Sequence, residues 1–343
     1  MKTLTESQKS NYSSIGTLLF GFPVTRHLKA SFGLMPYTSV GYNVSETKNL
    51  QIFNDSITRV KNIYDGDGGI NKVYMGMGYQ LSKNLSVGVN VDFLFGTINR
   101  NSAAHIPDQT YAISYRQTSS IRVHDFRYNF GMQYTTQIGK DRRFTFGAVY
   151  TPSIDIKANH DTTNMLVSPT NSDLIYYTIH QSTNIKGTIH IPQAMGAGFS
   201  YEKESKWLLA GDVYYQNWSK FKIFDQADSM KNSLKASLGL QIIPDGNDYN
   251  HYFKRVRFRM GVSYQQTYLQ LNNKQLNDFG ISLGVGLPLR KGQSEIYSKS
   301  AVNVGLEFGK RGTTDFSLIK ENYVRLTVSL SLYDSWFKKL KFY

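Results

Sequence analysis

Three arginines at alternating positions form the cluster of ionisable residues best suited to chemistry in this sequence. Arg255, Arg257 and Arg259 alternate with apolar residues. Side chains alternate between the two faces of a β-strand, so the three guanidinium groups would form a ladder on one face. Guanidinium groups hold carboxylates through charge-assisted hydrogen bonds. The pattern therefore indicates either a site for an anionic head group or a structural network of charges.

Charged residues elsewhere in the chain would share the face of this ladder. Arg325 and Lys235 are its candidate neighbours, and Glu307 and Asp212 offer counter-charges. The set of candidate ligand-binding residues is Arg255, Arg257, Arg259, Arg325, Lys235, Asp212 and Glu307. Charges that line a polar barrel lumen commonly pair with one another, so the sequence favours the structural network and leaves the ligand site open.

Other residue patterns offer little for catalysis. The seven histidines show no metal-binding spacing, and His124 and Asp125, as neighbours in a strand, would face opposite sides. The run Asp65–Gly68 resembles a calcium loop but lacks the later bidentate glutamate, so it predicts a turn. The chain has no cysteine. We expect no metal, no cofactor and no enzymatic activity; an outer-membrane hydrolase stays open only as a third alternative.

The elements that would position these residues are amphipathic strands. The segment 323–333, YVRLTVSLSLY, places Val324, Leu326 and Leu330 on one side and Arg325 and Ser329 on the other. Similar segments recur along the chain, each near the roughly 10 residues that a tilted strand needs to cross a bilayer. This recurrence predicts an all-β fold, a transmembrane antiparallel β-barrel of the outer-membrane type with about 13–14 strands.

Short and long breaks alternate between the predicted strands. Hairpins are predicted from 73–81 with 85–98, 126–137 with 144–156, and 193–202 with 207–216. Short breaks at 22–27, 82–84, 138–143 and 203–206 alternate with long ones at 38–72, 99–124, 157–192, 217–232, 266–278 and 309–322. Outer-membrane barrels keep short turns in the periplasm and long loops outside. The first and last strands would then both run inward, which implies that an upstream strand is missing.

The composition suits a membrane barrel better than a nucleic-acid-binding protein. Aromatic residues make up 14% of the chain, with 24 tyrosines, as expected of interfacial girdles. The mean hydropathy is −0.38, and no run approaches the roughly 18 apolar residues of a membrane helix. The net charge of +14 is scattered and forms no single stripe. We therefore expect contact with outer-membrane lipids and lipopolysaccharide and none with nucleic acid.

Several segments follow the motif order of a known family. Residues 191–221 read IPQAMGAGFSYEKESKWLLAGDVYYQNWSKF, with a proline before a glycine-bearing strand, a basic turn, a strand with the central Asp212, and a closing Trp-Ser-x-Phe. Residues 128–158, 258–264 and 305–337 continue the series. In this order they resemble the FadL/TodX (OMPP1) family of outer-membrane transporters in its Bacteroidota form.

The resemblance implies a single barrel domain over residues 1–333 and a periplasmic tail over 334–343. It also implies a fourteen-stranded barrel with an N-terminal hatch, and we expect both the hatch and the first strand to be missing from this sequence. The implied function is passive transport of hydrophobic or amphipathic molecules, such as long-chain fatty acids, across the outer membrane. The alternative is a FadL-like accessory subunit of a larger outer-membrane complex for barrel assembly or secretion, with outer-membrane or periplasmic proteins as partners.

Overall fold

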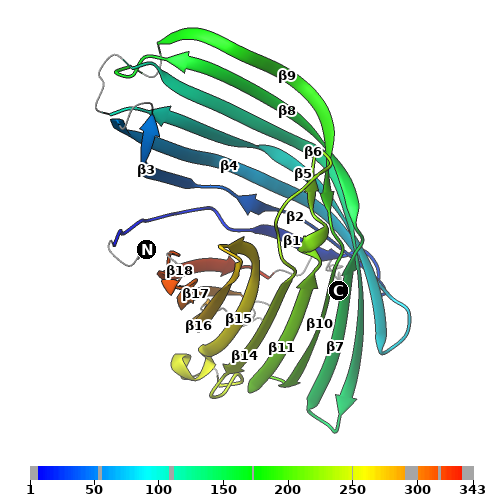
Figure 1. Cartoon of the computed structure of the whole chain (residues 1–343). Coiled ribbons are helices and arrows are strands. Elements are labelled where there is room, and N and C mark those ends of the chain that lie inside the picture. The colour runs from blue at the N-terminus through cyan, green and yellow to red at the C-terminus, as the bar shows by residue number, and fades with distance from the viewer. Residues whose placement is uncertain are drawn as a thin grey trace.

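The structure is a computed structural model that describes residues 7–52, 56–107, 112–171, 174–248, 250–289, 300–315 and 318–333. The regular structure in these ranges is one 18-stranded antiparallel sheet, with two short 3₁₀ turns, η1 (Trp218–Lys220) and η2 (Tyr252–Arg255) (Figure 1). Among the described residues, no helix is long and apolar enough to span a membrane. The predicted tail 334–343 lies outside the described residues.

The strands follow one another around a curved wall. They are β1 (Leu18–Pro23), β2 (Leu28–Ser39), β3 (Tyr42–Ile52), β4 (Ser56–Gln80), β5 (Leu85–His105), β6 (Ser114–Ile138), β7 (Arg142–Thr151), β8 (Ile154–Val167), β9 (Ile175–Ile191), β10 (Ala194–Lys203), β11 (Trp207–Gln216), β12 (Lys222–Ile223), β13 (Gln226–Ala227), β14 (Ser233–Ile242), β15 (Arg257–Leu271), β16 (Lys274–Pro288), β17 (Ala301–Arg311) and β18 (Glu321–Ser331). One pass is one crossing of the wall; β7 and β8 together make one pass, and so do β9 and β10. The passes are β1, β2, β4, β5, β6, β7 with β8, β9 with β10, β11, β14, β15, β16, β17 and β18. Their number agrees with the predicted 13–14 strands. No pairing joins β1 to β18 among the described residues.

The two faces of the wall differ as the alternation predicts. Val324, Leu326 and Leu330 are 67%, 64% and 59% exposed on the outer face of β18. Arg325, between them, faces inward and pairs with Glu307. The same alternation runs through β15 and β16, where large apolar side chains are exposed on the outer face. Exposed apolar side chains on every second position form the surface that a barrel presents to lipid.

One side of the wall extends far beyond the other. β4, β5 and β6 have 25, 21 and 25 residues, whereas β10, β11 and β14 have ten each. About ten residues suffice to cross a bilayer. Figure 1 shows β3, β4, β5, β6, β8 and β9 rising well above the shorter strands. This sheet extension occupies most of the segments that the sequence predicted as long loops.

The strand bounds correct two predictions. The run Asp65–Gly69 is not a turn but the middle of β4, because Gly68, with a φ of 97°, stays in the ladder opposite Ile98 of β5 instead of reversing the chain. The break at 266–278 is also shorter than predicted. β15 and β16 join through Asn272 and Asn273, whose φ values of 47° and 59° suit a tight hairpin.

Two neighbouring passes are interrupted at the same level. β7 and β8 are separated by Pro152 and Ser153, and β9 and β10 by Pro192 and Gln193. Proline cannot donate a ladder hydrogen bond, so the ladder breaks there. Side chains bind the freed backbone groups: Asp125 accepts from the Lys157 backbone N–H at 2.8 Å, and Gln216 donates to the Pro192 carbonyl at 3.3 Å. The breaks therefore interrupt the ladder of β6, which pairs with β8 up to Val123 and with β7 from Phe130.

Tyrosines packed over glycines lock adjacent strands together. Four direct cross-strand pairs join them: Gly33 with Tyr74, Gly66 with Tyr42, Gly196 with Tyr214, and Gly309 with Tyr323. A Cβ atom on any of these glycines would meet the ring of its partner, for example at 2.9 Å for Gly196 and Tyr214. The glycines thus make room for neighbouring side chains, a use of strand glycine that also supports sheet curvature.

Candidate functional site

The inner wall has three levels, and the level toward the long strands is an apolar core. Its buried members come from β4, β5, β6, β8 and β9: Ile70, Leu94, Ile121, Val123, Ile156, Ala158, Ile189 and Ile191. Leu94 and Ile156 are 0% exposed. An inward-facing side chain with no exposed surface is covered from the lumen side, so water does not reach this part of the inner wall.

The segment 217–232, between β11 and β14, covers this core from the inside. Phe221, Ile223 and Phe224 pack against the core cluster, and β12 forms a two-residue ladder with the lower end of β9. The ring of Phe224 fills the space over Gly187, where a Cβ atom would clash with it. At its start, the segment rests on β15 through Trp218 and Tyr268, whose ring centroids are 4.8 Å apart. The segment therefore bridges from β15 to β9 across the interior.

The middle level is a buried polar layer centred on Asp92, which is 1% exposed. Asp92 and Arg127 are direct cross-strand partners on β5 and β6. The Asp92 carboxylate accepts a hydrogen bond from the Asn129 side chain at 2.6 Å and lies 3.6 Å from the Lys72 ammonium. Asn129 in turn accepts from the Thr151 hydroxyl at 2.6 Å. The layer joins β4, β5, β6 and β7 and balances one carboxylate against two cations.

Arg127 links this layer to β2. Its guanidinium group lies 5.1 Å from the ring centroid of Tyr37, and the side chain is only 5% exposed. Its Nε atom is buried and has no hydrogen-bond partner among the described residues. Tyr37 also packs against the apolar core cluster. Side chains of β2, β5 and β6 therefore meet at this level.

Below the polar layer, toward the short turns, the lumen opens into a cavity of about 1280 Å³. Small inward residues dominate its wall, including Gly131, Gly198, Ser237, Gly261 and Gly284. Asn129 and Tyr214 lie toward the polar layer, and Arg259 lies near the short-turn end of β15. The cavity is the space within this wall that could accept an apolar or amphipathic guest.

The predicted arginine ladder has two rungs on β15 instead of three. Arg257 and Arg259 share its inner face, where Arg259 donates hydrogen bonds of 2.8 Å to Gln241 and to Asn303. The glycines opposite them, Gly286 and Gly284, leave room for both side chains. Arg255 lies instead in η2, over the ring of Tyr252 at 5.7 Å, because the chain turns there before β15 begins.

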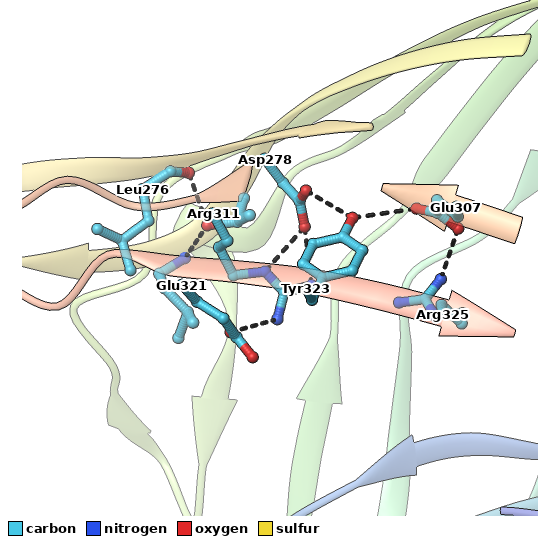
Figure 2. A network of polar contacts seen from close by, with 9 residues as sticks. Leu276, Asp278, Glu307, Arg311, Glu321, Tyr323 and Arg325 are labelled. Carbon is cyan, nitrogen blue, oxygen red and sulfur yellow. Dashed lines mark hydrogen bonds and ion pairs between the residues drawn. The ribbon is translucent and has the colours of Figure 1, made fainter. Parts of the chain in front are cut away.

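Two of the four remaining predicted site residues, Arg325 and Glu307, belong to a separate network near the long-loop end of β16, β17 and β18. Tyr323 donates to Asp278 at 2.9 Å or to Glu307 at 3.0 Å, and Arg325 pairs with Glu307 at 3.1 Å (Figure 2). Arg311 pairs with Asp278 at 2.8 Å. This network ties the last three strands together and does not contact the β15 arginines.

Lys235 and Asp212 are placed inward but apart from both groups. Lys235 lies on β14, opposite Tyr214 and Gln265. Asp212 lines the cavity from β11, with Gly198 and Ser237 as its cross-strand neighbours. Within the described part of the chain, neither side chain forms an ion pair, and no group of three or more acidic or histidine side chains could hold a metal ion.

The turn that contains Arg255 makes a testable pH prediction. The Lys254 ammonium and the backbone N–H of His251 bind the Asp248 carboxylate, and they hold the pKa of Asp248 well below its usual range. A depressed folded-state pKa stabilises the turn at every pH above the unfolded value of about 3.9, and this stabilisation is lost as the pH falls further. With a Phe253→Trp reporter in the turn, the contribution of the carboxylate to the indole fluorescence should be constant from pH 8 to about 5 and should be lost as the pH falls further.

Asp248→Asn removes the charge and should weaken the turn over that whole range. The fluorescence of the Asp248→Asn, Phe253→Trp double variant should therefore differ from that of Phe253→Trp at pH 7. Identical spectra would show that the carboxylate does not organise the turn.

The sequence did not single out Asp92, Arg127 or Tyr37 as site residues. The available signal was an isolated charge in an otherwise apolar segment, Asp92 in LSVGVNVDFLFG. Burial of a charge is costly unless it is paired, so such a residue marks a buried network. The strand pairing then identifies Arg127 as its partner.

The fold is that of the FadL-like outer-membrane β-barrel channels. The structure is similar to the CymD monoaromatic hydrocarbon channel, with a TM-score of 0.52, 15% identity, and coverage of 92% of this chain and 80% of that one. It is similar to a Pseudomonas aeruginosa FadL homologue, with a TM-score of 0.52, 12% identity and coverage of 86% and 69%. It is also similar to the Pseudomonas putida toluene transporter TodX, with a TM-score of 0.50, 14% identity and coverage of 91% and 80%.

Within this class, the sequence profile of the BamG family matches residues 1–343, and the chain belongs to the BamG family. No curated protein sequence shows significant similarity to it. At 12–15% identity the solved channels establish the fold and no more.

Proposed function

We propose that this protein is an outer-membrane barrel that serves as an accessory subunit of a larger envelope complex, the barrel-assembly machinery. The packed interior is the observation that carries this proposal. Leu94 and Ile156 are 0% exposed and Asp92 is 1% exposed, so side chains and the segment 217–232 cover the inner face of β4 to β9 at two of the three levels. A barrel with a packed inner face is rigid, and it would bind partner proteins through its outer surface.

Two further observations support the subunit role. The chain belongs to the BamG family, which favours barrel assembly over the secretion alternative. The sheet extension, β3 to β6 with β8 and β9, rises beyond the length needed to cross a bilayer and leaves exposed strand edges at β3 and β9. Exposed strand edges are surfaces through which proteins associate. The proposed location is the outer membrane, in contact with its lipids and lipopolysaccharide.

The test uses the protein at its native level. A tagged chain solubilised from native membranes in mild detergent should bring down partner proteins in fixed, near-equal amounts. Its depletion should lower the content of other β-barrels in the outer membrane. Recovery of a lone barrel, together with normal insertion of other barrels after depletion, would contradict the proposal.

A second candidate function is passive transport of hydrophobic or amphipathic molecules, such as long-chain fatty acids. The cavity of about 1280 Å³ favours it, and so does the resemblance of the fold to channels described as hydrocarbon and toluene transporters. Arg257 and Arg259, at the short-turn side of the cavity, would bind a carboxylate head group. In this role Arg325, Glu307, Lys235 and Asp212 contribute charge to the lumen, and Arg255 flanks it.

Transport is tested with the purified chain in phospholipid vesicles. Uptake of a radiolabelled long-chain fatty acid should exceed that of protein-free vesicles and should fall about tenfold in an Arg259→Gln variant, because a charge-assisted hydrogen bond contributes about 1.5–3 kcal/mol. Uptake equal to that of protein-free vesicles would remove this candidate and leave the subunit role intact.

A further inference from the structure

We infer that Arg127, in the polar layer of the inner wall, binds a small monovalent anion such as chloride. The inference goes beyond the proposed function, since this site would serve an assembly subunit and a transport channel alike. Arg127 lies on β6 and is only 5% exposed. Within the described part of the chain its buried Nε atom has no hydrogen-bond partner, and its guanidinium group forms no ion pair. Burial of a charge is costly unless the charge is paired and hydrogen-bonded, so Arg127 requires an acceptor.

Two other inward arginines show how such a side chain is accommodated in this wall. Arg259 donates a hydrogen bond of 2.8 Å to Gln241. Arg325 pairs with Glu307 at 3.1 Å, and with 57% of its side chain exposed it also meets water. Arg127 is more deeply buried than Arg325 and has no comparable acceptor among the described residues. A guanidinium group carries five N–H donors, and those of Arg127 point to an acceptor that is not a protein group.

Asp92 does not supply that acceptor, although it is the cross-strand partner of Arg127. The Oδ2 atom of Asp92 accepts from the Asn129 amide at 2.6 Å and lies 3.6 Å from the Lys72 ammonium. The ion pair of Asp92 is thus with Lys72. Two cations and one carboxylate leave one positive charge in the polar layer. A monovalent anion balances that charge.

The other neighbours of Arg127 are also engaged or unsuited. Asp125, two residues earlier on β6, accepts hydrogen bonds of 2.8 Å from the backbone N–H groups of Phe126 and Lys157. The ring centroid of Tyr37 lies 5.1 Å from the guanidinium carbon. A cation–π contact offsets part of the charge, but the face of a ring offers no oxygen or nitrogen atom to the N–H donors. The donors of Arg127 are therefore left for a ligand.

The burial of the site limits the size of its ligand. Arg127 and Asp92 do not line the large cavity, whereas Asn129 does. A long amphipathic guest in the cavity would therefore contact Asn129 and not the guanidinium group. The 5% of Arg127 that remains accessible admits a particle about the size of water, and chloride is only slightly larger. The site thus suits a halide and excludes a lipid head group.

The first test measures the unfolding of the full chain as chloride is varied. The barrel in phospholipid vesicles is titrated with urea while sodium chloride replaces sodium gluconate, at constant ionic strength and on both sides of the bilayer. An anion that binds only the folded state lowers the equilibrium constant for unfolding in proportion to its concentration once the site is saturated. We therefore expect a decrease of about tenfold for a tenfold rise in chloride. An equilibrium constant that does not respond to chloride would overturn the inference.

A pair of variants assigns the effect to Arg127. Arg127→Met removes the charge, keeps an apolar side chain of similar length, and should abolish the chloride dependence. The control is Arg122→Met on the same strand, because Arg122 is 49% exposed and already pairs with Asp161 at 2.8 Å. It should keep the dependence of the native chain. Equal chloride dependence in Arg127→Met and in the native chain would place the anion elsewhere and overturn the inference.

A direct readout on the native chain covers the case in which Arg127→Met does not fold. Crystals of the full chain grown in sodium bromide and measured at the bromine absorption edge should show an anomalous peak beside Nε of Arg127. Density at that position without an anomalous signal, as a water molecule would give, would contradict the inference, and so would the absence of any density there. None of these results affects the co-purification of partners, which tests the proposed function separately.

Discussion

Asp92→Ala is expected to lower the free energy of unfolding by about 3–5 kcal/mol. The carboxylate is 1% exposed, lies 3.6 Å from Lys72 and is the cross-strand partner of Arg127. Its removal leaves two cations in the packed lumen without a counter-charge, which costs far more than the lost hydrogen bond to Asn129. The measurement is a urea titration of the barrel in phospholipid vesicles, followed by the mobility shift of the folded form.

Asp212→Ala is the matched control for Asp92→Ala. Asp212 also faces the lumen, but it lines the open cavity and forms no ion pair among the described residues. Its removal should change the free energy of unfolding by less than about 0.5 kcal/mol. Equal effects of the two substitutions would mean that the polar layer is not a coupled network.

Gly309→Val is expected to destabilise the barrel by about 3–5 kcal/mol, since overpacking costs about 1–3 kcal/mol and lost hydrogen bonds to charged groups add to it. The ring of Tyr323 occupies the space where a Cβ atom on Gly309 would lie. Displacing that ring moves the hydroxyl away from Asp278 and Glu307 (Figure 2). The same urea titration measures the loss.

Gly305→Val provides the comparison on the same strand and face. The nearest atom to a Cβ on Gly305 is the Leu283 backbone oxygen, at 3.9 Å, so the added side chain enters open lumen. We expect a change below about 1 kcal/mol. If Gly305→Val destabilised the barrel as much as Gly309→Val, the general cost of a branched side chain in β17 would explain both, and the role of the tyrosine would be lost.

Alternation of side chains was enough to predict the barrel and its faces. The pattern of Val324, Arg325 and Leu326 places each residue on the face where the structure has it. The predicted hairpins at the short turns are confirmed, because those turns are short polar runs between clearly apolar strands. Alternation also predicts that Arg325 and Glu307 both face the lumen. They are cross-strand neighbours of opposite charge, and such neighbours form ion pairs.

The upper half of the wall was predicted as loops for a physical reason. Beyond the bilayer a strand needs no apolar outer face. The alternation of apolar and polar residues is therefore lost from the sequence there, although the backbone hydrogen bonds between strands continue. β4 therefore runs through Asp65–Gly69, and β5 and β6 extend to His105 and from Ser114. Only pairing between strands, which a single sequence does not display, reveals these continuations.

The polar layer could not be assembled from the sequence either. The odd or even position of a residue in a strand predicts which face of the wall its side chain is on. Its height along the barrel axis depends on the stagger between neighbouring strands, which the sequence does not give. Tyr37, Asp92 and Arg127 lie on β2, β5 and β6, far apart in the chain, and the stagger brings them together. The prediction for Arg255 was wrong for a related reason. Alternation placed it in a ladder with Arg257 and Arg259, but β15 begins at Arg257, and Arg255 lies in η2.

The central claim is that alternate residues of each pass face lipid and their neighbours face the lumen. Because the chain has no cysteine, single cysteines at positions 258–264 of β15 can each carry a spin label in vesicles. The account predicts a two-residue period: labels at positions 258, 260, 262 and 264 should collide with oxygen dissolved in the bilayer, and labels at 259, 261 and 263 should not. Uniform accessibility along β15, or an alternation with the opposite phase, would contradict it.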